Sequence, residues 1–162
     1  MRWPRRKRPP PPNVARPRSS ASINSASNPV ASEPLDRDTL LSLYRGYLTC
    51  LNEQNWAQLG DFVHPEVTHN ARPLGLAGYQ AMLEDDHRAI PDLHFRAETL
   101  VADPPVIAAR LRFDCTPLGM LFDLPVDGRR VTFDEHVFYR VTDGRIREVH
   151  SLIDRDAIAA QI

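Results

Sequence analysis

The feature that most constrains the fold is the alternation of apolar and polar residues in VTFDEHVFYRV, residues 131–141. Successive side chains of a β-strand point to opposite faces, so this period of two predicts a strand with one face against a core. The dipeptide Asp143-Gly144 follows, and then a second apolar-rich segment, residues 146–153. An Asp-Gly pair between two such segments is typical of a tight turn. The sequence therefore predicts a β-hairpin over residues 131–153.

One charged residue interrupts the apolar face of this strand. Glu135 falls in register with five apolar side chains, those of Val131, Phe133, Val137, Tyr139 and Val141. Placing a carboxylate among apolar neighbours costs free energy unless it is paired or protonated. Two interpretations are open. Glu135 forms a salt bridge with Arg110 or Arg112 on a neighbouring strand, or it is a carboxyl with a raised pKa that donates or accepts protons in a cavity.

The segments before the hairpin predict helices first and strands afterwards. Asp36 or Asp38 can cap a helix that continues to Gln54, with apolar residues at helical spacing. The other expected elements are a short helix over residues 55–63, a short strand over 66–70, a third helix over 74–90, strands over 91–102 and 106–115, and a C-terminal helix after Asp154. This order predicts an α+β fold, in which a curved antiparallel sheet packs against three N-terminal helices around a small-molecule cavity.

Composition divides the chain at residue 34. Residues 1–34 hold eight of the 15 prolines, seven of the 20 Lys and Arg residues and one of the 21 acidic residues. We expect this Pro- and Ser-rich basic tail to be disordered, with organelle targeting or a nuclear signal as alternatives. Residues 35–162 keep 13 basic and 20 acidic residues, a net charge of −7. Such an acidic domain is not expected to bind nucleic acid.

Several classes of protein are disfavoured by what the sequence lacks. The chain has no apolar run near the roughly 20 residues of a membrane span, and its two cysteines, Cys50 and Cys115, predict no disulfide framework. Its single lysine, Lys7, lies in the tail, so the domain has no lysine for a Schiff base. The acids and histidine of EDDH, residues 84–87, would splay around a helix, so we expect no metal site. The expected location is the cytoplasm.

The chain resembles the SnoaL-like polyketide cyclases, within the cone-shaped NTF2-like superfamily that includes ketosteroid isomerase. Three segments carry the resemblance: YLTCLNEQNWAQLGDFVHPEVTHN, LGLAGYQAMLEDDHRAIPDLHF and PVDGRRVTFDEHVFYRVTDGRIREVHSLID. The resemblance covers residues 36–160 and implies an NTF2-like cone containing an acid–base site that needs no cofactor. Family cyclases remove a proton next to a carbonyl and stabilise the resulting enolate during ring closure.

The resemblance also suggests which residues form the site. It aligns Tyr47 with a helix-1 tyrosine and His69 with a general-base aspartate of ketosteroid isomerase, whereas the usual acid and a helper histidine fall on Val137 and Pro117. Glu135, two residues before Val137, faces the same side and can supply the carboxyl. We therefore expect His69, Glu135 and Tyr47 to be catalytic. Further substrate contacts are expected from Asn70, Trp56, His136, His150 and Asp154.

Two functions remain open at this stage. The first is a cofactor-independent cyclase, isomerase or dehydratase that acts on a hydrophobic polyketide-like or terpenoid-like carbonyl compound. The second is a non-catalytic module that binds an apolar ligand or a protein partner, which the residues at Val137 and Pro117 favour. Several histidines and acids also have structural interpretations, since Asp154 can cap a helix and His136 can face solvent or a partner subunit. We expect the protein to be a homodimer.

Overall fold

A computed structural model describes residues 35–162 of the chain. The interpretations of the basic tail, residues 1–34, lie outside these described residues. The helical elements are α1 (Arg37–Asn52), the 3-10 turn η1 (Trp56–Gln58), α2 (Leu59–Phe62), α3 (Gly75–Ala89) and α4 (Arg155–Ala159). The strands are β1 (Val63–His69), β2 (Arg72–Pro73), β3 (Arg96–Asp103), β4 (Val106–Cys115), β5 (Met120–Leu121), β6 (Leu124–Pro125), β7 (Val131–Thr142) and β8 (Arg145–Ile153).

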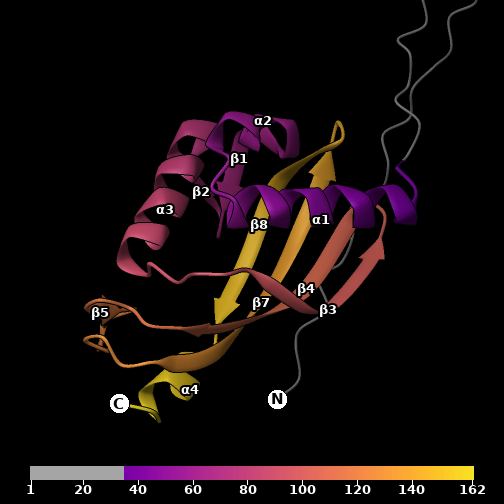
Figure 1. Ribbon diagram of the computed structural model, residues 1–162. Coiled ribbons are helices and arrows are strands. Elements are labelled where there is room, and N and C mark those ends of the chain that lie inside the picture. The colour runs from indigo at the N-terminus through magenta and orange to yellow at the C-terminus, as the bar shows by residue number, and fades with distance from the viewer. Residues whose placement is uncertain (1–34) are drawn as a thin grey trace, which may run out of the picture. The chain divides into compact units, whose positions relative to one another are not determined.

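The main sheet has six strands in the order β2-β1-β8-β7-β4-β3, and it is antiparallel except where β1 pairs in parallel with β8. Helices α1 and α3 lie across one face of this sheet (Figure 1). The α+β class and the curved, mainly antiparallel sheet predicted from the sequence are therefore confirmed. The parallel pair was not predicted, because it joins segments about 80 residues apart and leaves no local signal.

Helix α1 shows how local sequence places the core. The side chain of Asp36 accepts a hydrogen bond of 2.7 Å from the backbone N–H of Thr39, so this residue is the cap of the helix. The apolar stripe is buried against the sheet and comprises Leu40, Tyr44, Tyr47, Cys50 and Leu51. At its C-terminal end, the Asn52 amide pairs with both the N–H and the C=O of Phe95, at 2.7 and 3.0 Å. These contacts fix α1 over the entry to β3.

The β7–β8 hairpin agrees with its sequence pattern. Asp143 and Gly144 both have positive φ, of 50° and 72°, as a tight hairpin turn requires. Along β7 the apolar side chains predicted for one face are buried, and His136 and Phe138 on the other face are exposed. The hairpin thus presents one face to the helices and the other to the outside.

Two expectations about the strands need correction. The strand predicted from residue 91 starts only at Arg96, because Pro91 and Asp92 form a turn in which the Asp92 carboxylate accepts a hydrogen bond from the Thr116 N–H at 2.8 Å. Residues 116–130 contain a small hairpin, β5–β6, that the sequence did not predict. Its turn uses positive φ at Phe122 and Asp123, so no glycine marks it.

Candidate active site

A cavity of about 280 Å³ lies between the helices and the concave face of the sheet. Its walls are mainly aromatic and aliphatic, with Phe95, Phe113, Phe133 and Leu83 among the lining side chains. The β5–β6 hairpin contributes Leu121 and Phe122 to the lining. Such an apolar cavity with a few polar groups is the usual form of a small-molecule site. The chemistry of this site therefore rests on its few polar side chains.

Glu135 projects from β7 into this cavity. Burial raises the pKa of its carboxyl to about 7; a hydrogen bond from Ser151 opposes the increase, and the charge of Asp86 adds to it. Asp86 of α3 also lines the cavity, and burial of its carboxyl together with the charge of Asp85 raises its own pKa to about 6. Near neutral pH the Glu135 carboxyl is therefore present in both protonation states, as an acid–base group requires.

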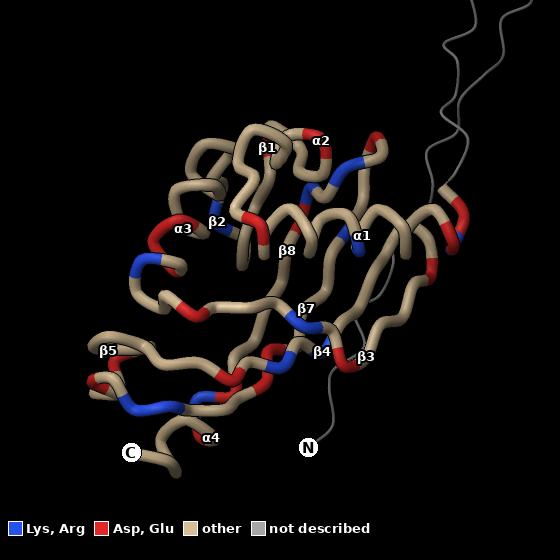
Figure 2. Tube along the Cα trace, viewed as in Figure 1, with Lys and Arg blue, Asp and Glu red and all other residues tan. Residues whose placement is uncertain are grey.

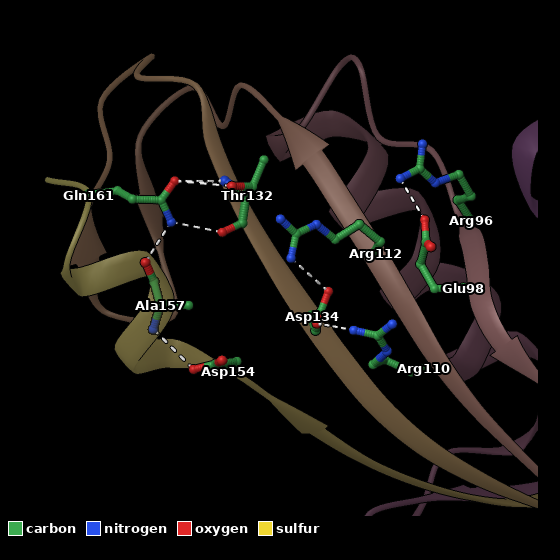
Figure 3. A network of polar contacts seen from close by, with 9 residues as sticks. All are labelled: Arg96, Glu98, Arg110, Arg112, Thr132, Asp134, Asp154, Ala157 and Gln161. Atoms are coloured by element: carbon green, nitrogen blue, oxygen red, sulfur yellow. Dashed lines mark hydrogen bonds and ion pairs between the residues drawn. The ribbon is translucent and has the colours of Figure 1, made fainter.

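The salt bridge with Arg110 or Arg112, the alternative predicted for Glu135, is made by the preceding residue, Asp134. Asp134 faces the outer side of the sheet and accepts hydrogen bonds of 3.1 Å from both Arg110 and Arg112 (Figure 3). Burial by itself would raise the pKa of Asp134, but the two guanidinium groups outweigh it and lower the pKa. The arginines on β4 thus bind Asp134 on the outer face, and Glu135 stays free to serve the cavity.

All four tyrosines of the chain meet beside Glu135. The hydroxyls of Tyr47 and Tyr79 lie 2.8 Å apart, and the Tyr44 hydroxyl donates to that of Tyr139 at 3.4 Å. In each pair one hydroxyl uses its hydrogen on the other, which leaves one hydrogen per pair to donate elsewhere. Burial raises the pKa of Tyr79, Tyr47 and Tyr139 above the ordinary value of a phenol. These phenols stay protonated and serve as hydrogen-bond donors.

His69 ends β1 at the wall of the same cavity. Its Nε2 lies 3.4 Å from the Ser151 hydroxyl, and its ring centre lies 6.3 Å from that of Tyr79. Burial lowers the pKa of His69, and the charges of Arg72 and His150 lower it further. A neutral imidazole able to accept a proton is therefore favoured at neutral pH.

The structure places the predicted residue Asn70 outside the cavity lining, with its side chain on the backbone of Ser151. The Asn70 Oδ1 accepts from the Ser151 N–H at 2.9 Å, and its Nδ2 donates to the Ser151 C=O at 3.2 Å. Its amide is thus engaged by the protein in this structure. Asn70 has a positive φ of 46°, which turns the chain from β1 towards β2.

Four other predicted contact residues also lie away from the cavity lining. Trp56 packs beside His87, with ring centres 5.7 Å apart. His136 and His150 are exposed on the outer face of the sheet. Asp154 caps α4 by accepting a 3.0 Å hydrogen bond from Ala157 N–H (Figure 3). Of the eight predicted site residues, the cavity brings together only Tyr47, His69 and Glu135.

Sequence reasoning missed three polar members of the cavity lining: Tyr79, Asp86 and Ser151. Tyr79 and Asp86 lie seven residues apart on α3, so helical periodicity would have placed them on one face. Ser151 lies two residues before Ile153 on β8, and both line the cavity, so the period of two would have indicated its direction.

Two other kinds of feature are not formed by the described residues. Within residues 35–162 no three His, Cys, Asp or Glu side chains are grouped so that they could hold a metal ion. No helix in the same range is long and apolar enough to cross a membrane. Lys and Arg are scattered among Asp and Glu over the described elements (Figure 2).

Comparison with known proteins gives the family. The sequence model of the SnoaL-like polyketide cyclases matches residues 41–162. The chain belongs to this SnoaL-like family. A SnoaL-like polyketide cyclase from Agrobacterium tumefaciens is 52% identical to our SnoaL-like chain, with a TM-score of 0.75 over 75% of this chain and 96% of that one. No curated protein matched the chain.

Two more distant structures show the shared fold. TsrD from Streptomyces laurentii is 24% identical, with a TM-score of 0.70 over 78% of this chain and 96% of that chain. IdmH from Streptomyces antibioticus is 19% identical, with a TM-score of 0.65 over 75% of this chain and 96% of that chain. The resemblance predicted from the sequence is therefore confirmed at the level of family and fold.

Proposed function

We propose that the protein is a cofactor-independent acid–base enzyme, a cyclase or isomerase, that acts on a small, neutral carbonyl compound with an apolar skeleton. The observation that carries the proposal is Glu135, a carboxyl with a pKa of about 7 in an apolar cavity wall. The cavity volume of about 280 Å³ is near the lower end of the range for ligand pockets, roughly 300–1,000 Å³.

The first step is removal of a proton from carbon. The ionised Glu135 carboxylate takes the proton next to the substrate carbonyl, and the electrons of that C–H bond form an enolate. A free hydroxyl hydrogen of the Tyr47–Tyr79 pair, or of Tyr139, donates to the oxygen on which charge develops. These donors are held by their own hydrogen bonds and packing before the substrate arrives, so they need little reorganisation.

The second step returns the proton. In an isomerase, protonated Glu135 delivers it to another carbon of the enolate. In a cyclase, the enolate carbon attacks a second carbonyl of the same molecule, a C–C bond forms, and the new alkoxide takes the proton from Glu135. Both sequences balance without an oxidant or a metal, because the substrate and the product are isomers.

The family resemblance places the usual catalytic acid at the position of Val137, and Glu135 would supply that carboxyl instead. Val137 is buried on the same face of β7, two residues further along. A carboxyl shifted by two residues along a strand moves by roughly 6.6 Å, since each residue adds about 3.3 Å. The reacting carbon of the substrate is thus expected about one residue pair nearer to Phe133.

Exchange of carbon-bound hydrogen tests the proposal without knowledge of the natural substrate. Bicyclic aryl ketones such as 1-tetralone would be incubated with the full chain in D₂O, and loss of the proton next to the carbonyl would be followed by NMR. The native protein should accelerate exchange, and Glu135→Gln should lower the rate by about 10²–10⁴-fold, the usual contribution of a general base.

The matched control is Asp134→Asn, which removes the adjacent carboxyl from the opposite face of the same strand. It should keep the native exchange rate provided that the variant folds, which circular dichroism would establish. Equal exchange rates for the native protein and Glu135→Gln would refute the role of Glu135.

A further inference from the structure

Ser151 lies between the two titratable groups that are best placed for proton transfer. Its hydroxyl oxygen is 3.4 Å from Nε2 of His69, and its side chain lines the same cavity as the Glu135 carboxyl, whose pKa it lowers. Ser151 itself lies on β8, opposite Val137 of β7, so its side chain shares the concave face with Glu135. His69 reaches the same point from β1, on the other side of β8. Three strands thus converge on one hydroxyl.

The backbone of Ser151 is fixed by an uncommon arrangement. Strand β1 ends at His69, and the Asn70 N–H still donates to the Val149 carbonyl at 2.8 Å. Beyond that point the Asn70 side chain replaces the missing strand, because its amide pairs with both the N–H and the C=O of Ser151. An amide that satisfies both groups of one residue restrains its backbone, and therefore the direction of its side chain.

We propose that Ser151 is a positioning residue that joins Glu135 and His69 into one proton-transfer unit, with Asn70 holding Ser151 in place. This proposal rests on the acid–base function proposed above. It assigns a role to two residues that carry no charge, and it gives Asn70 a task different from direct contact with the substrate.

The hydroxyl permits two complete hydrogen-bond patterns. With Glu135 ionised, Ser151 donates to the carboxylate and accepts from the Nε2–H of His69. With Glu135 protonated, the carboxyl donates to Ser151, which donates in turn to the unprotonated Nε2. The second pattern becomes the first when the carboxyl proton moves to the serine oxygen while the serine proton moves to Nε2 of neutral His69. One proton thereby passes from Glu135 to the imidazole, which becomes imidazolium, with no net change in the serine.

This unit offers a path for the proton that Glu135 removes from the substrate. Glu135 is partly buried in a cavity whose walls are mainly apolar, so few groups lie near enough to take up its proton. His69 is only partly buried and lies near exposed Arg72. Passage through Ser151 to His69 would reset the carboxylate when the product leaves without taking the proton back.

Other charged and titratable groups face the unit and enter any measured titration. Glu135 interacts electrostatically with Asp86 and with the four tyrosines, Tyr44, Tyr47, Tyr79 and Tyr139. Those acting on His69 are Arg72 and His150. The test therefore compares variants that leave all of these groups unchanged.

The experiment is a pH titration of the full chain by NMR, with ¹³C in the glutamate carboxyl and ¹⁵N in the histidine ring. Ser151→Ala should raise the pKa of Glu135 by roughly half a unit to one unit, because one stabilising hydrogen bond to the carboxylate is lost. It should also remove from the His69 signals the inflection that follows Glu135. Ser151→Thr keeps a hydroxyl and should restore both features.

Two further variants make the test specific. Leu152→Ala changes an exposed neighbour on the other face of β8 and should titrate as the native chain does. Asn70→Ala keeps the hydroxyl but frees its backbone, and should shift the Glu135 pKa in the same direction as Ser151→Ala. Titration curves of Ser151→Ala that coincide with the native curves would overturn the proposal. The titration uses no substrate, so it tests the role of Ser151 alone. The proposed function fails by a different result, an exchange assay in which Glu135→Gln stays as active as the native protein.

Discussion

Replacing Glu135 by Gln removes an ionisable carboxyl from the cavity wall and keeps nearly the same side-chain shape. The pKa of this group is about 7 in the folded protein, because burial disfavours the charged form, against 4.5 as its ordinary value. Between these two pH values the folded state binds more protons than the unfolded state. The free energy of unfolding must therefore fall as pH rises from 4.5 through 7, and then level off.

The size of this effect follows from the shift. The difference is about 2.5 pKa units, and each unit corresponds to about 1.4 kcal/mol, so the ionised carboxyl costs the folded state about 3 kcal/mol at pH 8 or above. Glu135→Gln has no such cost. We expect the variant to be close to native in stability at pH 4.5 and about 3 kcal/mol more stable than native at pH 8.

The assay is urea unfolding of both proteins at several pH values from 4.5 to 9, monitored by circular dichroism. Titration of all other groups enters both curves, so the difference between native and variant isolates Glu135. Asp134→Asn should show a pH dependence of opposite sign, because Arg112 and Arg110 lower the pKa of Asp134. The native protein should be more stable than this variant near neutral pH, and the difference in free energy of unfolding should disappear at acid pH. A difference between native and Glu135→Gln that does not change with pH would refute the reasoning.

Three further outcomes are expected. His87 is buried, and its Nε2 has no hydrogen-bond partner among the described residues. Burial lowers the pKa of His87, so the free energy of unfolding should fall as pH drops below 6.5. His87→Phe should flatten that part of the urea-unfolding profile, whereas His94→Phe at an exposed position should not. Asp86→Asn removes a charge that raises the Glu135 pKa, so the pH at which the ketone's hydrogen exchange in D₂O reaches half its maximal rate should move lower. An unchanged midpoint, or an equal shift in the control Asp85→Asn, would contradict this. Phe138 and Leu152 are 56% and 72% exposed on the outer face of the sheet, as in a face that packs against a second subunit. If the expected homodimer uses this face, the double variant Phe138→Ser, Leu152→Ser should sediment more like a monomer, and Val101→Ser on the edge strand β3 should change sedimentation less.

The sequence was most informative where a pattern repeats along one element. The period-two alternation of β7 placed Glu135 on the covered face, because the backbone pleat alone fixes which side each residue takes. The same alternation placed His136 on the opposite face, where it is exposed. The Asp143-Gly144 turn and the Asp36 cap were also predictable, since each depends on only a few neighbouring residues.

The partner of each acid was not predictable in this way. Arg110 and Arg112 were candidates for Glu135 by sequence, yet both bind Asp134, one residue earlier in the chain. The face of the strand decided this outcome, because the two arginines lie on the outer side of β4 with Asp134. Similarly, Asn70 follows His69 directly, but its positive φ turns its amide towards the backbone of Ser151.

By itself the sequence determined the fold class, the family resemblance, and the candidate residues Tyr47, His69 and Glu135. Only the tertiary structure decided that His69 meets Ser151, a residue 82 positions away, and that Tyr47 meets Tyr79, 32 positions away. The physical reason is that local periodicity fixes the direction of a side chain relative to its own element. Which side chains then meet depends on the pairing of β1 with β8 and on the packing of α1 and α3 over the sheet.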